Sequence, residues 1–77
     1  MVGVEITRRV FVAIADAHPD GSAYEISRVD IRRGWGNVVN VTIHGGGDPQ
    51  GHGRVIREAI ERALETERHS VRLETTA

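Results

Sequence analysis

The chain of 77 residues contains no cysteine and no lysine, and it has one tryptophan, one tyrosine and one phenylalanine. Without cysteine, a disulfide framework, a thiolate zinc site and a cysteine nucleophile are all excluded. The lack of disulfides fits a reducing compartment. All ten basic residues are arginine. The absence of lysine is typical of a GC-rich genome. The alternative is a functional reason, that arginine makes bidentate contacts with carboxylates or phosphates.

Long hydrophobic runs and a strong excess of one charge are also missing. No apolar run approaches the roughly 18 residues that cross a bilayer. In residues 1 to 18 the charges lie inside the apolar stretch rather than before it, which argues against a secretory signal. The formal net charge is −1, without the basic excess of dedicated nucleic-acid binders. We expect a cytoplasmic protein with no membrane segment.

The short length predicts one domain over residues 1–77. A chain of this size buries only about 60% of its unfolded surface, so its stability is small and a deep substrate cleft is difficult to enclose. No small-molecule substrate and no cofactor is evident from the sequence.

Hydrophobic periodicity predicts five elements. Apolar residues at steps of three and four predict helices over residues 5 to 17 and 54 to 68. Alternating apolar and polar residues predict three strands, around Val29 and Ile31, around Val39 to Ile43, and around Val71 and Leu73. The order helix, strand, strand, helix, strand predicts an α+β, two-layer sandwich in which two helices cover one face of a three-stranded, mainly antiparallel sheet.

Two local alternatives remain within this scheme. Tyr24 and Ile26 are out of phase with Val29 and Ile31, which indicates either a β-bulge or a strand that begins near Ser27. If the segment "VGVEI" forms a first strand, a ferredoxin-like arrangement is a second candidate for the fold.

The most unusual stretch is "HGGGDPQGHGR", residues 44 to 54. His44, Asp48 and His52 are candidate metal ligands, because histidine and aspartate suit zinc and related ions. Their spacing is not that of an established metal motif. A phosphate site is also considered, since glycines before a helix can expose N–H groups to an anion. The residues that should follow in a phosphate-binding loop are replaced by His52 and Gly53.

The preferred interpretation of this stretch is structural. It connects a strand to a helix, which begins either at Pro49 with Asp48 as its N-cap or later, near Gly53. No metal is therefore expected.

The segment "RRGWGN", residues 32 to 37, carries the candidate binding residues. Trp35 lies at the tip of a predicted hairpin loop beside Arg32, Arg33 and Asn37. An exposed tryptophan next to arginines is typical of a protein contact or of stacking on a nucleic-acid base. The alternative is that Trp35 folds back over its own core.

No serine–histidine arrangement of a known hydrolase motif is present, and His18 and His69 lie at the ends of predicted elements. We therefore expect a non-catalytic interaction domain, not an enzyme, that binds a protein partner or a second copy of itself. An adaptor, an inhibitor or an assembly subunit, encoded by a phage or mobile element, fits this size. The alternatives are an RNA- or single-stranded-DNA-binding domain and, third, a metal-dependent enzyme that uses His44, Asp48 and His52.

The hairpin "ISRVDIRRGWGNVVNVTI" and the final strand "HSVRLET", in the order helix-strand-strand-helix-strand, resemble the type II KH arrangement, and are most similar to the ribosome-binding factor A family. The resemblance implies an RNA-associated α+β domain. The chain departs from that pattern because type II KH domains place two helices between strands two and three, joined by a Gly-x-x-Gly loop or a kink. Here one uninterrupted helix is predicted, and the glycines precede it.

Overall fold

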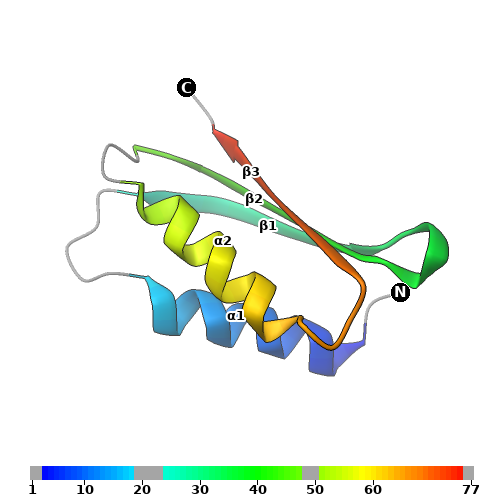
Figure 1. The fold of residues 1–77 in the computed structure, drawn as a ribbon. Coiled ribbons are helices and arrows are strands. Elements are labelled where there is room, and N and C mark those ends of the chain that lie inside the picture. Colours follow the sequence, from blue (N-terminus) through cyan, green and yellow to red (C-terminus); the bar gives the residue numbers. More distant parts are fainter. Residues whose placement is uncertain (1–2, 19–23, 48–50, 76–77) are drawn as a thin grey trace.

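The computed structural model describes residues 3–18, 24–47 and 51–75, and it has the predicted α+β order (Figure 1). The described elements are helix α1 (Val4–Ala17), strand β1 (Glu25–Arg33), the short 3-10 turn η1 (Trp35–Asn37), strand β2 (Val39–Gly46), helix α2 (His52–Ala63) and strand β3 (His69–Thr75).

The three strands form one mixed sheet in the order β1-β2-β3. β1 and β2 are antiparallel, as the hairpin predicts, and Asp30 lies opposite Thr42. β3 is parallel to β2, so that Thr42 also lies opposite Arg72. α2 carries the chain back along the sheet before β3 begins, which allows a parallel strand to follow β2. One of the two pairings is therefore parallel, in a sheet expected to be mainly antiparallel.

A bulge in β1 explains the change of phase at its start. Ile26 pairs with Gly45 and Arg28 with His44, which leaves Ser27 as an extra residue. The hydroxyl of Ser27 donates a hydrogen bond to the carbonyl oxygen of His44, 3.1 Å away. The bulge places Ile26 on the apolar face together with Val29 and Ile31, and the prediction of a bulge is confirmed.

The core lies between one face of the sheet and the two helices. Val39, Val41 and Ile43 of the central strand have no exposed surface. They pack in one cluster with residues of both helices, with the residue that follows α2 and with the residue before β1: Ile6, Val10, Tyr24, Ile56, Ile60 and Leu64. Each such side chain contributes roughly 1.5–3 kcal/mol through burial. Both helices thus cover the apolar face and leave the other face of the sheet open (Figure 1).

The helix ends differ in detail from expectation. Residues 4 to 6 belong to α1, so a ferredoxin-like first strand over them is wrong. α2 begins at His52 after Gly51, whose φ of 73° is left-handed. This agrees with the later of the two predicted starts, and Asp48 and Pro49 lie outside the described residues. α2 ends at Ala63 rather than at residue 68: Leu64 is its C-cap, with a φ of −105° and a ψ of 16°, and β3 begins at His69.

Candidate functional site

The hairpin tip presents Trp35 to solvent. Trp35 is 98% exposed, so the alternative in which it covers its own core is excluded. Gly36 and Asn37 have positive φ values of 71° and 62°, a conformation that glycine adopts freely and asparagine tolerates. The amide of Gly34 donates to the carbonyl oxygen of Val38 at 2.8 Å and closes the loop.

Two arginines donate hydrogen bonds to this loop. Nη1 of Arg33 donates to Oδ1 of Asn37 at 2.7 Å. Nη1 of Arg68 donates to the carbonyl oxygen of Gly36 at 3.3 Å. The backbone of Arg68 is itself fixed, because its carbonyl oxygen accepts the amide of Val39 at 2.7 Å. The tip is thus a tied loop, by which we mean a loop held by these hydrogen bonds, with two guanidinium groups and an exposed indole. We call Arg33, Trp35, Asn37 and Arg68 the tip surface.

Arg68 is a member that sequence reasoning missed. It directly precedes β3, and β3 begins opposite Val39, the first residue of β2 after the hairpin loop. Only the parallel pairing of β2 and β3 brings residue 68 beside residue 36. No local pattern in the sequence carries that information.

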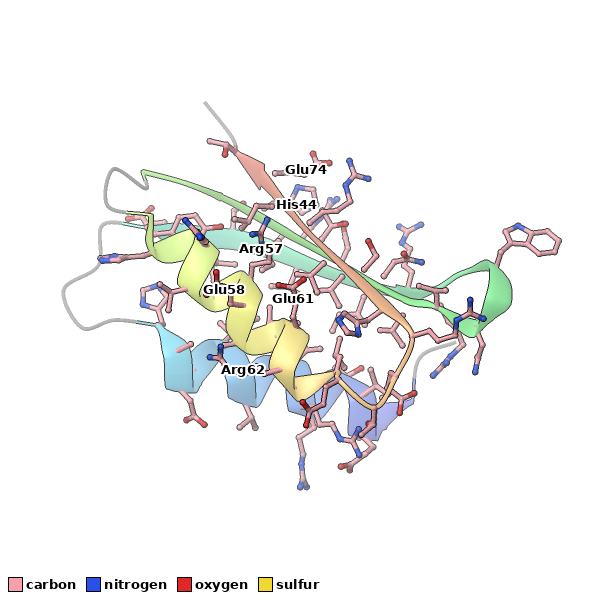
Figure 2. All side chains as sticks on the ribbon, in the orientation of Figure 1. His44, Arg57, Glu58, Glu61, Arg62 and Glu74 are labelled. Atoms are coloured by element: carbon pink, nitrogen blue, oxygen red, sulfur yellow. The ribbon has the colours of Figure 1, made fainter. Side chains whose placement is uncertain are left out.

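Arg32 does not belong to the tip surface. It lies opposite Asn40 in the antiparallel pair and lines a shallow hollow of about 250 Å³ on the open face of the sheet, together with Asp30, Asn40, Thr42, His44 and Glu74. Figure 2 shows His44 and Glu74 on the side of the sheet that faces away from the helices. The structure therefore divides the expected binding residues between two surfaces.

Polar contacts on the open face centre on the carboxylate of Asp30. Its Oδ2 accepts from Nε2 of His44 at 3.0 Å and from Nη2 of Arg28 at 2.8 Å. The hydrogen bond from His44, aided by the hydrogen bond and the positive charge of Arg28, lowers the pKa of Asp30 below its usual value, against a smaller opposing effect of desolvation. Asp30 therefore stays a carboxylate and fixes the ring of His44.

The candidate metal ligands are not brought together in the part of the chain that the structure describes. His44 lies on the open face of the sheet, whereas α2, which begins at His52, packs on the opposite face. Asp48 lies outside the described residues. No group of three or more histidine, aspartate and glutamate side chains within residues 3–18, 24–47 and 51–75 has the arrangement of a metal site.

The comparisons with known proteins add no family. Models of protein families, curated proteins and solved structures all give no match to this chain. In the described residues, neither helix has the length and apolar character that crossing a membrane requires.

Proposed function

We propose that this chain is a non-catalytic interaction domain that binds a protein partner through the tip surface, in the cytoplasm. The observation that carries the proposal is the 98% exposure of Trp35 on a loop tied down by Arg33 and Arg68. A large aromatic side chain left in water contributes nothing to the core of this small domain. Contact with a partner would bury the apolar surface of Trp35 and so stabilise the complex.

The residue types at the tip support a protein interface. Tryptophan and arginine are enriched among the residues that dominate binding energy at such interfaces. A tryptophan buries about 150–250 Å², and at about 25 cal/mol per Å² this gives roughly 4–6 kcal/mol before the costs of association. Because the loop is already tied, little conformational freedom is lost on binding.

The chemistry of the tip also describes the partner. An apolar pocket is needed to accept Trp35, and carboxylates at its rim would pair with Arg33 and Arg68. Guanidinium groups bind carboxylates through bidentate hydrogen bonds. The proposed partner therefore carries an apolar pocket with an acidic rim.

Binding of single-stranded RNA or DNA is the second candidate. The observation that favours it is the pair of guanidinium groups beside an exposed aromatic ring, since bases stack on such rings while arginines contact phosphates. The sequence resemblance to type II KH domains points the same way. The net charge of −1 weighs against it, and we rank it below the protein partner.

Affinity capture from the source lysate, with and without nuclease, separates the two candidates. The bait is the tagged wild-type chain beside Trp35→Ala, and Val4→Ala is the matched control, since Val4 is 85% exposed but lies on α1. We expect a protein that survives nuclease, is captured by wild type and Val4→Ala, and is lost from Trp35→Ala.

Two outcomes would contradict the proposal. If Trp35→Ala captures the same protein as wild type, the tip is not the contact surface. If the captured material disappears with nuclease and binding weakens steeply with added salt, phosphate contacts dominate and the nucleic-acid candidate replaces the protein partner.

A further inference from the structure

The outer edge of β1 carries no paired strand in the described part of the chain. The sheet order β1-β2-β3 places β1 at one edge with β2 as its single neighbour, and β1 is nine residues long. Such an edge presents a row of backbone N–H and C=O groups that can template another strand. Natural sheets usually block such edges, so the side chains along β1 decide whether it repels or accepts a partner.

We propose that two copies of this chain pair along β1, antiparallel, about a two-fold axis at Val29, and so form a continuous six-stranded sheet. In this register residue 29 lies opposite residue 29 of the second copy. Because the two strands run in opposite directions about this axis, residue 28 lies opposite residue 30 of the second copy. Opposite residues in such a pair share one face of the sheet.

The charges on the open face are self-complementary in this register. Arg28 of each copy lies opposite Asp30 of the other, so opposite charges face each other across the axis, although these two residues already pair within one chain at 2.8 Å. Beyond the bulge at Ser27, Glu25 of each copy lies opposite Arg32 of the other, which makes two new ion pairs related by the axis. Within the described residues, neither Glu25 nor Arg32 has an ion-pair partner in its own chain. The second copy would supply one to each.

The bulge makes the apolar face match as well. Because Ser27 is the extra residue, Ile26 lies opposite Ile31 of the second copy, and Val29 lies opposite Val29 of the second copy. Without the bulge, Ile26 would face Arg32 across the pair. Ile26, Val29 and Ile31 stay only partly buried, although they lie on the face that the helices cover. A second copy beside them would cover this apolar row.

Other pairings match less well. With the axis at Asp30, two Asp30 carboxylates would face each other and Arg28 would face Arg32. With the axis at Ile31, Asp30 would face Arg32, but Val29 would face Arg33. The other sheet edge, β3, can pair Arg72 with Glu74 of a second copy, but these two residues already pair within one chain at 3.2 Å. Among these pairings, the one centred on Val29 is the one in which both Glu25 and Arg32 gain a partner.

This dimer would place the two tip surfaces at opposite ends of the joined sheet. From Val29 to Arg33 is four residues, or ~13 Å at ~3.3 Å per residue, so the two Arg33 residues would lie ~26 Å apart along the pair. Both open faces would lie on the same side. The dimer stands independently of the proposed function, because neither Glu25 nor Arg32 belongs to the tip surface.

Sedimentation equilibrium and light scattering test the pairing on the full chain. The wild type is expected to sediment as a dimer of the 8.5 kDa chain. Arg32→Glu places Glu25 against glutamate, and Glu25→Arg places Arg32 against arginine. Each variant alone is expected to weaken the dimer by about tenfold or more. Mixed together, the two variants restore opposite charges in both contacts, so a heterodimer of near wild-type affinity is expected.

Arg72→Glu is the matched control, because it reverses a charge on the same face at the other edge of the sheet. It is expected to leave the dimer unchanged, and circular dichroism reports whether each variant folds. As a second measurement, Val29→Cys introduces the only cysteine of the chain, and a short thiol cross-linker is expected to join two copies, whereas Val71→Cys on β3 is not joined.

Three results would overturn the proposal. The first is a wild-type monomer at hundreds of micromolar. The second is a dimer that Arg32→Glu and Glu25→Arg leave intact, and the third is a dimer that Arg72→Glu disrupts instead. Because the tip is tested with Trp35→Ala and the edge with Arg32→Glu, loss of one property is distinguishable from loss of the other.

Discussion

Nε2 of His44 on β2 lies 3.0 Å from Oδ2 of Asp30 on β1, and the two residues are diagonal neighbours, since Asp30 is directly opposite Thr42. Diagonal residues on one face of an antiparallel pair are within reach of long side chains. A carboxylate only accepts hydrogen bonds, so Nε2 of His44 carries the hydrogen. Arg28, directly opposite His44, contacts the same carboxylate. One aspartate thus joins two residues that the sequence separates widely.

This arrangement predicts an acid-sensitive contribution to stability. The pKa of Asp30 is lowered by His44 and Arg28 from its usual 3.8. A group with a depressed folded pKa stabilises the protein above its unfolded pKa, and this contribution is lost as pH falls through the lower, folded value. Asp30→Asn is therefore expected to reduce the free energy of unfolding at pH 5 to 7 and to lose its difference from wild type in acid.

Urea unfolding followed from pH 2 to pH 7 measures this difference. Asp16→Asn is the control, since it also removes one negative charge but from an exposed position on α1 that makes no ion pair in the described residues. Stability curves of wild type and Asp30→Asn that stay parallel down to pH 2 would contradict the assigned role of His44 and Arg28.

Local patterns were sufficient to predict most of the fold. The helices follow from apolar residues at steps of three and four, and the hairpin from alternation on either side of Trp35, because these periods reflect which face is buried. The phase change at Ile26 even indicated the bulge. One extra residue in a strand moves every later side chain to the other face, so a mismatch between Ile26 and Val29 is informative.

Non-local features could not be predicted in this way. The parallel pairing of β3 depends on how α2 packs, and the contact of Arg68 with Gly36 depends on that pairing. The end of α2 was also missed, because residues 64 to 68 contain neither glycine nor proline to mark it. Leu64 is buried like Ile56 and Ile60, so the apolar pattern continues past the point where the helix ends and does not mark it.

Gly45 in β2 is predicted to be intolerant of a side chain. A Cβ at this position would lie 2.6 Å from atoms of the Tyr24 ring and 2.7 Å from the carbonyl oxygen of Glu25. Backbone cannot move away cheaply, so Gly45→Ala is expected to cost about 1–3 kcal/mol. Gly3→Ala is the control, since nothing lies within 4 Å of its Cβ position, and less than about 1 kcal/mol is expected. Chemical denaturation measures both, and equal stabilities would contradict the prediction.

The centre of the sheet is predicted to be sensitive to the loss of side-chain volume. Ile43 is fully buried on the central strand, so Ile43→Ala is expected to cost about 2–5 kcal/mol. A domain of this size has only about 4–12 kcal/mol in total, so this variant is expected to lose a large part of its stability. Ile43→Val keeps the loss measurable at about 0.5–1.5 kcal/mol. Val4→Ala is expected to change stability by less than about 0.5 kcal/mol, and thermal melts compare the three.

Asn37 has two separable roles at the tip. Its φ of 62° is left-handed, and its Oδ1 accepts a hydrogen bond from Nη1 of Arg33. Asn37→Gly keeps the backbone conformation accessible but removes the hydrogen bond, whereas Asn37→Ala removes the bond and adds a left-handed strain of roughly 1–2 kcal/mol. Asn37→Ala is therefore expected to be the less stable of the two, while Asn37→Gly stays within about 0.5 kcal/mol of wild type.

Partner binding is expected to respond differently from stability. Both variants lose the side-chain hydrogen bond from Arg33 and keep only its longer contact with the Asn37 carbonyl oxygen, at 3.5 Å. If the side-chain hydrogen bond pre-organises the tip, both are expected to bind the captured partner more weakly than wild type because more freedom is lost on association. Trp35 is the sole tryptophan, so its fluorescence anisotropy reports the order of the tip directly. A lower anisotropy and weaker binding in Asn37→Gly, at unchanged stability, would show that the tied loop serves recognition. Full binding by Asn37→Gly, with anisotropy equal to wild type, would show instead that the contacts of Arg33 and Arg68 with backbone carbonyl oxygens are sufficient to hold the tip.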